Sequence, residues 1–461
     1  MADSPYFGMQ GTGRWDGDER PQSWRQQLLK NYPRGSMPIT AIMSKAGKTV
    51  IGDPVFHWWE KDLIQNAGVI AVAEDGDETA IYIDQAMTDI YEDGWAGWNA
   101  PVGTTLHIKI DATADNPLTN YVRVGSDIVL VNTLHYGCCT RAVVTNVDRA
   151  AGANSRITIK LLTADTAVDL TSLAHANRVI VMPTTFPEFG GVPQPQGFKP
   201  HSYENYTTIK KTSIAESRTA MSVKNLRPDS NDYKEAKREA LEILGMQMEW
   251  ETFFGILDES TDPDNNQPIR RSMGIRQFIE NHGLSTNIAS YKYAADYSGK
   301  TWLQGGYQWL MDMMLTFSTY SDLENMLHVV GNGVKMALTN LAESRRTITM
   351  TQMDIAFGLS ISKFITPWGT FNIVDAPLWN REPTMQYTWL GIPRDAMDYH
   401  TLTEPETGNS DIQFLPDPNY GKGGMGHVDG RFDLWLVEFG YEFHKSKEWF
   451  LLYDVGVDNA V

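Results

Sequence analysis

The sequence predicts an α+β fold in which an all-β region interrupts a mixed one, and three stretches support this prediction. Residues 229–257 form a long helical run. Residues 67–197 instead hold short apolar segments about a dozen residues apart, separated by Gly, Asn and Asp, as in a small β barrel or sandwich. A stretch rich in proline and glycine, residues 183–200, marks the end of this region.

The composition is that of a folded protein. The chain has 461 residues, of which 42% are hydrophobic and 21% charged, which is enough for roughly two or three domains with a buried core. No apolar run approaches the ~20 residues that cross a bilayer, so we expect no membrane contact. The two cysteines, Cys138 and Cys139, are adjacent, which excludes a disulfide framework. Together with His135 they lack a second pair of ligands, so no zinc site is predicted.

The charge is uneven along the chain. The net charge is −18, yet residues 1–48 carry seven basic and four acidic side chains, a surplus that leaves −21 for the rest. A basic arm on an acidic body can pair with another copy of the chain or touch a polyanion, and a simply solvated arm is an equal alternative. The acidic body argues against broad phosphate binding.

The segments after this arm predict a long hairpin. Residues 50–63 are expected to form one extended strand, whose Phe56, Trp58 and Trp59 are too apolar for an unprotected edge. The alternating segment 204–217 is expected to pair with it as the return leg, which makes the β-rich region an insertion. Within the insertion, alternation predicts strands around residues 106–110, 128–132, 143–147, 157–159 and 179–181.

The helix at 229–257 is expected to be a spine that joins two layers. At 1.5 Å per residue it would be roughly 40 Å long. Its first half has a charged outer face, whereas aromatic side chains surround its end, and Phe254 is expected to be a core residue there. Its apolar stripe recurs at three- and four-residue steps, at Tyr233, Ala236, Ala240, Leu244 and Met248.

The C-terminal part predicts a sheet covered by helices. After a loop at 259–274, residues 301–343 read as helix, strand and helix, and strands are expected at 359–366, at 370–374 and twice within 432–457. The loop opens like a calcium-binding loop, but Gln267 and Met273 replace the Gly and Glu that such a loop requires. The sequence Gly331-Asn332-Gly333 matches neither nucleotide-binding motif and predicts a tight turn into a helix.

No combination of residues predicts catalysis. A Gly-x-Ser-x-Gly nucleophile elbow is missing from the sequence, and Glu249 and Glu251 would point to different faces of the helix. The tryptophan pairs at 58–59 and at 95 and 98 could stack on sugar rings, although burial or an interface is commoner for Trp. We therefore expect no enzyme, no cofactor and no metal site.

The order of these parts resembles the HK97-like major capsid proteins of tailed bacteriophages. The resemblance covers most of residues 35–461 and is strongest to the branch typified by phage SU10. It rests on the stretches GDPVFHWWEKDL, ENYTTIKKTSIAESRTAMSV, EWETFFGI, RRSMGIRQFI, VVGNGVKMALTNL and EFGYEFHKSKEWFLLYDVGV.

The resemblance implies a division into five parts. The N-terminal arm would be residues 1–49. The E-loop strands would be 50–66 and 198–222, on either side of an inserted β-barrel or sandwich domain at 67–197. The P domain with the spine helix would be 223–275 and 432–449, and the A domain 276–431 and 450–461.

It also implies a function. The chain would be a major capsid protein that self-assembles into hexamers and pentamers of an icosahedral or prolate head. That head would form in the bacterial cytoplasm, enclose double-stranded DNA, and involve a portal protein and possibly a scaffold or cement protein. The alternatives are a β-rich carbohydrate-binding or hydrolytic protein, or another virion component such as a tail tube or decoration protein. The residues expected at assembly contacts are Arg25, Arg34, Trp58, Trp59, Tyr206, Arg270 and Arg271.

Overall fold

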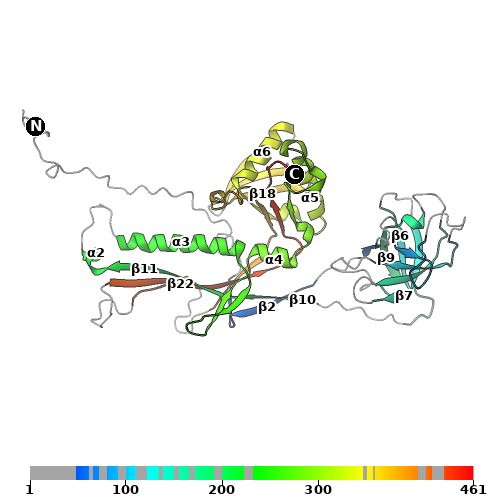
Figure 1. Ribbon diagram of the computed structural model, residues 1–461, viewed down its shortest axis with the longest axis horizontal. Helices are drawn as coiled ribbons and strands as arrows, with labels where there is room; N and C mark the ends of the chain where they lie inside the picture. The colour runs from blue at the N-terminus through cyan, green and yellow to red at the C-terminus, as the bar shows by residue number, and fades with distance from the viewer. Residues whose placement is uncertain are drawn as a thin grey trace, which may run out of the picture. The chain divides into compact units, whose positions relative to one another are not determined.

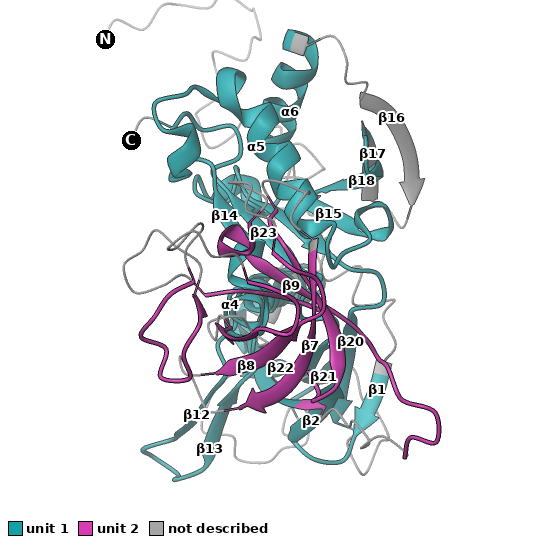
Figure 2. Ribbon diagram, turned by 90° about the vertical axis from the view of Figure 1, so that its right-hand side faces the viewer, with its two compact units in different colours: residues 1–60, 202–461 teal, residues 61–201 magenta. Residues whose placement is uncertain are grey.

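The protein consists of two compact units, which Figure 2 distinguishes by colour: unit 2 is residues 61–201, and unit 1 is residues 1–60 and 202–461. Strands dominate both units and helices are few. Unit 2 is one continuous stretch that interrupts unit 1 in the sequence. The computed structural model describes residues 48–61, 66–71, 80–91, 100–110, 122–133, 139–149, 155–165, 172–191, 200–222, 232–345, 350–356, 359–402, 412–417 and 430–459.

Unit 2 is a single antiparallel sheet in the order β3-β9-β6-β7-β8-β5-β4. Ile70, next to β3, bridges to Ile110, next to β5, and the Ala71 N–H donates to the Lys109 carbonyl at 3.0 Å. The two ends of the sheet therefore meet, which makes a barrel. Its elements are β3 (Ala67–Val69), β4 (Ile81–Tyr82), β5 (Thr105–Lys109), β6 (Ser126–Val131), β7 (Cys139–Asp148), β8 (Arg156–Leu161), a 3₁₀ helix (Leu173–His175) and β9 (Arg178–Thr184).

Alternation along the strands builds the interior of this barrel. Strand side chains at every second position point inward and are fully buried, as at Leu106 and Ile108 in β5 and at Ile128 and Leu130 in β6. Cys138 and His135, considered above as metal ligands, lie outside the described residues, as does the side chain of Cys139.

Unit 1 is organised around the β22 sheet, named after its central strand. One edge of β22 pairs antiparallel with β11 over ten residues, from Thr208 opposite Phe439 to Ser217 opposite Gly430. Its other edge pairs with β20 and β21, and β1 adds parallel to β20. The strands of this sheet are β1 (Lys48–Ile51), β11 (Thr208–Ser217), β20 (Met397–Leu402), β21 (Gln413–Leu415) and β22 (Gly430–Phe443).

The long hairpin predicted from residues 50–63 and 204–217 is only partly right. Residues 50–63 divide into β1 and β2 (Val55–Glu60), because the chain bends at 52–54, where the Asp53 carboxylate accepts a hydrogen bond from the Val55 N–H at 2.8 Å. Strand β2 pairs with β10 (His201–Tyr206), whereas β11 pairs with β22. The predicted partner segment thus changes sheets near residue 207.

Helix α3 (Asp232–Phe254) lies along β11 and β22, as Figure 1 shows. Ala240, Leu244 and Met248 of the predicted stripe are buried. The helix is fixed to the sheet by the Trp435 indole N–H, which donates to the Lys237 carbonyl at 3.1 Å, and by an ion pair between Lys210 and Glu251 at 2.7 Å. A short helix, α2 (Arg218–Ser222), follows β11.

The prediction that Phe254 belongs to the core is wrong. Phe254 is 40% exposed and stacks on Trp250, whereas the preceding Phe253 is fully buried against Trp379. Adjacent residues of a helix face directions about 100° apart, so only one of the two can point inward. Gly255, the residue after the helix, has no room for a side chain, because a Cβ there would lie 2.6 Å from the Ser272 carbonyl oxygen.

The predicted loop at 259–274 is mostly a β hairpin. Strands β12 (Asp258–Thr261) and β13 (Pro268–Arg271) pair antiparallel, with Asp258 opposite Arg271 and Glu259 opposite Arg270. Opposite charges directly across a strand pair stabilise it. The prediction of a loop rested on the many Pro, Asp and Asn residues and overlooked these charge pairs. The turn at its tip contains Asn266 in the left-handed region, at φ 58°.

The rest of unit 1 is the β15 sheet with its helices, in the order β14-β23-β19-β15-β18-β17-β16. The predicted succession of helix, strand and helix in 301–343 is confirmed as α5, β15 and α6. The elements are α4 (Ile275–His282), β14 (Ile288–Ser290), α5 (Trp302–Phe317), β15 (Leu327–Val330), α6 (Asn332–Arg345), β16 (Met350–Ala356), β17 (Leu359–Thr366), β18 (Gly369–Asp375), β19 (Trp389–Ile392), β23 (Phe450–Tyr453) and 3₁₀ helices at Ser285–Asn287, Ala295–Tyr297, Leu323–Asn325 and Trp379–Arg381.

Close packing explains the two glycines at the turn into α6. A Cβ at Gly331 would lie 2.3 Å from the Gln386 carbonyl oxygen, and one at Gly333 would lie 2.6 Å from the Tyr387 ring. Both positions therefore require glycine because another segment passes close by, and no nucleotide is needed to account for them.

Phe253→Ala should destabilise the protein by about 3–5 kcal/mol, because a buried ring in contact with Trp379 is replaced by a cavity. Phe254→Ala is the matched control and should cost about 1 kcal/mol or less, since that ring is partly exposed already. Urea unfolding of the two variants measures both values, and equal losses would contradict this assignment of the core.

His328 should make the stability depend on pH. It is fully buried, its Nε2–H lies 3.1 Å from the Leu323 carbonyl, and its Nδ1 accepts the Trp389 indole N–H at 3.1 Å. This pair of contacts requires the neutral ring, and burial lowers the pKa of His328 from 6.5 to about 4.

Because the unfolded chain binds a proton more readily, the contribution of His328 is complete above pH 6.5 and is lost as the pH falls toward 4. The loss amounts to about 3 kcal/mol. His328→Gln can form both hydrogen bonds but cannot titrate. Its unfolding free energy, measured from pH 7 to 4, should fall less steeply than that of the wild type, and parallel curves would refute the role of this histidine.

Candidate functional site

The β2–β10 ribbon, which is the two-stranded sheet of β2 and β10, has one buried and one exposed face. Phe56 and Trp58 are 8% and 5% exposed, whereas Trp59 is 67% exposed and His57 lies on the same outer side. Successive strand residues point to opposite faces, so the two neighbouring tryptophans have different roles. Trp58 is a core residue, and Trp59 is available to an outside partner.

The buried face of the ribbon packs onto unit 1 through rings. Phe56 meets His400 edge-on at 4.7 Å between centroids, and Trp58 lies 5.7 Å from Tyr203. Tyr203 in turn meets Phe278 of α4 edge-on at 6.2 Å. The aromatic side chains predicted to need cover thus find most of it inside the same chain.

Tyr206 and Arg270 are brought together at the base of the ribbon. Burial is the main cause of the raised pKa of Tyr206, and the charges of Glu204 and Glu259 add to it while Arg270 opposes it. Arg270 also lies 3.6 Å from Glu259 across the β12–β13 hairpin. These groups therefore form one cluster, in which Tyr206 and Arg270 are half-buried and both glutamates are exposed.

Arg271 serves the hairpin itself. It forms an ion pair with Asp258 on the opposite strand, and its Nη1 donates to the Ser260 hydroxyl at 3.0 Å. About half of its side chain is exposed. The other two predicted contacts, Arg25 and Arg34, lie outside the described residues.

Asn205 connects three segments of unit 1 and was not predicted. Its Oδ1 accepts the N–H groups of Tyr206 at 2.8 Å and Met273 at 2.7 Å, and its Nδ2 donates to the Tyr441 carbonyl at 2.7 Å. The side chain is fully buried. It therefore satisfies buried backbone groups where the chain passes from β10, in the ribbon, to β11, in the β22 sheet.

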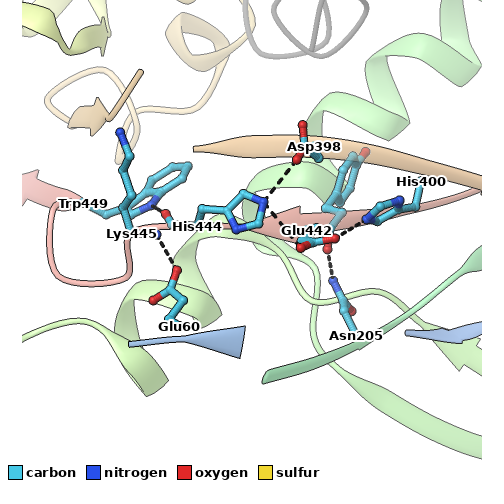
Figure 3. Close-up of polar contacts among 9 residues, drawn as sticks. Glu60, Asn205, Asp398, His400, Glu442, His444, Lys445 and Trp449 are labelled. Carbon is cyan, nitrogen blue, oxygen red and sulfur yellow. Dashed lines mark hydrogen bonds and ion pairs between the residues drawn. The ribbon is translucent and has the colours of Figure 1, made fainter. Parts of the chain in front are cut away.

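Glu60, the last residue of β2, holds the turn between β22 and β23. Figure 3 shows its carboxylate facing this turn, where it accepts the backbone N–H groups of Lys445 and of Ser446, the latter at 3.2 Å. Lys445 adopts the left-handed region, with φ 61°. Hydrogen bonds to a charged acceptor are stronger than neutral ones, so this contact ties the ribbon firmly to the turn.

A row of ionisable side chains crosses the β20–β22 pair nearby. His444 Nε2 lies 3.1 Å from Asp398 and 3.4 Å from Glu442, and Glu442 also pairs with His400 (Figure 3). The groups follow one another in a line, each histidine beside a carboxylate. Among the described residues, no three His, Cys, Asp or Glu side chains converge so as to hold a metal ion. Attraction between these histidines and carboxylates can help to hold β20 and β22 together.

No motif in the sequence marks Asn205 or Glu60. Both act on backbone groups more than two hundred residues away, at Tyr441 and at Lys445. A single Asn in an alternating segment does not reveal which backbone groups its side chain binds. The one usable signal is that Asn205 stands at a position whose strand neighbours two residues away face inward.

Comparison with known proteins gives one family. Residues 35–397 match the family model described as SU10 major capsid protein. The search of curated proteins gave no significant match.

Solved structures show distant likeness only. One from Mycobacterium phage Bobi is 9% identical, covers 96% of this chain and 94% of its own, and has a TM-score of 0.41. The satellite phage P4 procapsid, including its size determination (Sid) protein, is 13% identical, covers 59% and 78%, and scores 0.34. The holo-SrpI encapsulin complex from Synechococcus elongatus PCC 7942 is 9% identical, covers 56% and 76%, and scores 0.36. With TM-scores below 0.5, the family assignment rests on the sequence match.

Asn205→Ala should destabilise unit 1 by about 3 kcal/mol, because it leaves buried backbone groups at Tyr206, Met273 and Tyr441 without their partner. Asn265→Ala removes a similar side-chain contact, to the Gln267 N–H, at the exposed hairpin tip and should change stability by about 0.5 kcal/mol or less. Chemical unfolding compares the variants, and a small effect at Asn205 would show that water replaces its hydrogen bonds.

Proposed function

This chain belongs to the SU10 major capsid protein family, and from that premise we propose how its parts build the shell. As a member of that family it is a structural protein of the phage virion that assembles with copies of itself, and it is not an enzyme. The family removes the alternatives of a carbohydrate-binding or hydrolytic protein, a tail tube protein and a decoration protein. Within the described ranges, no helix combines the length and hydropathy needed to span a membrane.

The β22 sheet and α3 correspond best to the P domain of an HK97-like subunit. The ten-residue pairing of β11 with β22, covered by the 23-residue helix, supports an elongated element of this kind. Strands β1, β20 and β21 pair into the same sheet, so the P domain extends beyond residues 223–275 and 432–449 to include them.

The β15 sheet with α4, α5 and α6 corresponds best to the A domain. The sequence resemblance assigned residues 276–431 and 450–461 to this domain, and the strands that pair into the β22 sheet are now taken out of it. The hydrophobic interior between this sheet and the helices α5 and α6 supports a domain with its own core. In this assignment the A domains meet around the centres of hexamers and pentamers of an icosahedral or prolate head.

The remaining parts reach toward neighbouring copies. Residues 1–49 would be the N-terminal arm, with Arg25 and Arg34 as candidate contacts, and the β2–β10 ribbon would be the base of the E-loop. Residues 67–197 would be an inserted domain, and their barrel of short strands supports this. Arg271, half exposed on its hairpin, and the Tyr206–Arg270 cluster remain candidate contacts.

The proposed partners beyond the chain itself are packaged double-stranded DNA, a portal protein and possibly a scaffold or cement protein. The net charge of −18 supports an inner wall that does not adhere to DNA.

The observation that best supports this function is the exposed face of the ribbon. Trp59 exposes two thirds of its surface on a strand whose opposite face is buried. Tryptophan on a fixed, projecting strand is the type of residue that dominates protein interfaces. We propose that Trp59 inserts against a neighbouring subunit.

Expression of the chain should give closed shells, visible by electron microscopy and in sedimentation. Trp59→Ser should lower the shell yield at least tenfold at equal protein concentration, because loss of an interface tryptophan costs about 2 kcal/mol or more per contact. Trp59→Phe keeps an apolar ring and should assemble nearly normally. A soluble wild-type monomer at all concentrations would refute the proposed assembly, and normal shells from Trp59→Ser would refute the contact.

A further inference from the structure

We propose that Glu60 is a positioning residue for assembly: with the β22–β23 turn it forms a latch that fixes the direction of the β2–β10 ribbon. This proposal rests on the function proposed above and adds a second residue to the same site. Trp59 is the residue that would touch a neighbour, whereas Glu60 binds a turn of its own chain. Because the two are adjacent in β2, the conformation of Glu60 governs where the Trp59 side chain points.

Both strands of the ribbon reach the same turn. From β2, Glu60 accepts the N–H groups of Lys445 and Ser446. From β10, the Tyr203 hydroxyl lies 3.5 Å from the Ser446 hydroxyl. The charged contact of Glu60 is the stronger of the two, since a carboxylate accepts both N–H groups.

The turn is itself held to the β15 sheet and its neighbouring segments. The buried Asn287 side-chain amide donates to the carbonyls of Lys447 and Trp449, at 2.9 and 2.7 Å. The Ser321 hydroxyl donates to the Glu448 carbonyl at 2.8 Å. The fully buried Trp449 closes the turn by donating its indole N–H to the His444 carbonyl at 2.7 Å (Figure 3). Glu60 therefore binds a fixed structure.

The ribbon is attached at two separate points. Asn205 fixes β10 to Tyr441 and Met273, and Glu60 fixes β2 to the turn after β22. A two-stranded ribbon is only marginally stable alone and can pivot about a single attachment. The buried rings of Phe56 and Trp58 also hold the ribbon, so loss of Glu60 should leave the ribbon folded with only its β2 end released from the turn.

The turn carries a conformational cost that the latch offsets. Lys445 is a non-glycine residue at φ 61°, a conformation that costs roughly 1 kcal/mol. Its N–H then faces Glu60, and its Nζ donates to the Arg394 carbonyl at 2.9 Å. These contacts therefore hold a side chain at a position where glycine would cost less.

The test uses the full-length chain with four variants. Glu60→Ala removes both hydrogen bonds, and Glu60→Gln keeps the shape while losing the charge. Glu242→Ala is the control, because Glu242 is a partly exposed carboxylate of α3, outside the ribbon, that pairs with Arg238 one turn earlier at 2.9 Å. Trp59→Ser removes the contact but leaves the latch. Hydrogen–deuterium exchange of the peptide containing Lys445 and Ser446 and shell formation by electron microscopy are measured for each.

Glu60→Ala should raise exchange at this peptide at least tenfold and convert uniform shells into open or irregular assemblies, with Glu60→Gln intermediate. Trp59→Ser should lose shells without altering exchange, and Glu242→Ala should match the wild type in both measurements. Uniform shells or unchanged exchange in Glu60→Ala would overturn the latch. If the wild type forms no shells, the proposed function fails, while the exchange measurement still decides whether Glu60 secures the turn. Should Glu60→Ala not fold, Glu60→Gln decides by the same two measurements.

Discussion

The arrangement of unit 1 depends on the hydrogen bonds of one buried side chain, Asn205. A strand that leaves a sheet exposes backbone groups that the sheet no longer satisfies, and burying them without partners would cost several kcal/mol. Asn205 supplies partners to Met273 and Tyr441 at the point of departure. This allows residues 201–217 to serve two sheets in succession, first as β10 and then as β11.

The same requirement links the shell-building parts to one another. The ribbon, the end of the β12–β13 hairpin and the central strand β22 meet at Asn205, and the turn after β22 receives Glu60. Apolar packing from Phe56, Trp58 and Phe278 lies in the same core, and the contacts of Asn205 are buried there. Such buried networks are specific in direction, because each donor has one acceptor within reach. They suit a protein whose copies must all have the same shape.

Local patterns in the sequence were sufficient to predict helices and strands, but they did not predict which segments contact one another. Helix α3, the strands of the barrel and the succession α5, β15 and α6 follow from periodicity, because it reports which side of an element faces a core. Periodicity cannot state which of two adjacent rings, Phe253 or Phe254, is buried at a helix end, or that 208–217 pairs with β22. The sequence alone could not show that Trp58 is buried and Trp59 exposed, because this depends on which face of β2 is covered by the rest of unit 1. Glu60 and Asn205 bind backbone atoms, and the residue types of the segments that supply these atoms do not reveal the contacts.

The position of β22 in the chain has a consequence for synthesis. Strands β11, β20 and β21 all pair with residues 430–443, so the β22 sheet cannot form while the ribosome is still adding earlier residues. Unit 2, by contrast, pairs strands only within residues 67–184 and can fold as soon as it emerges. The surfaces of the β22 sheet thus arise only after residue 443 has been added. Contacts that use these surfaces can form only between chains that have been extended past this point.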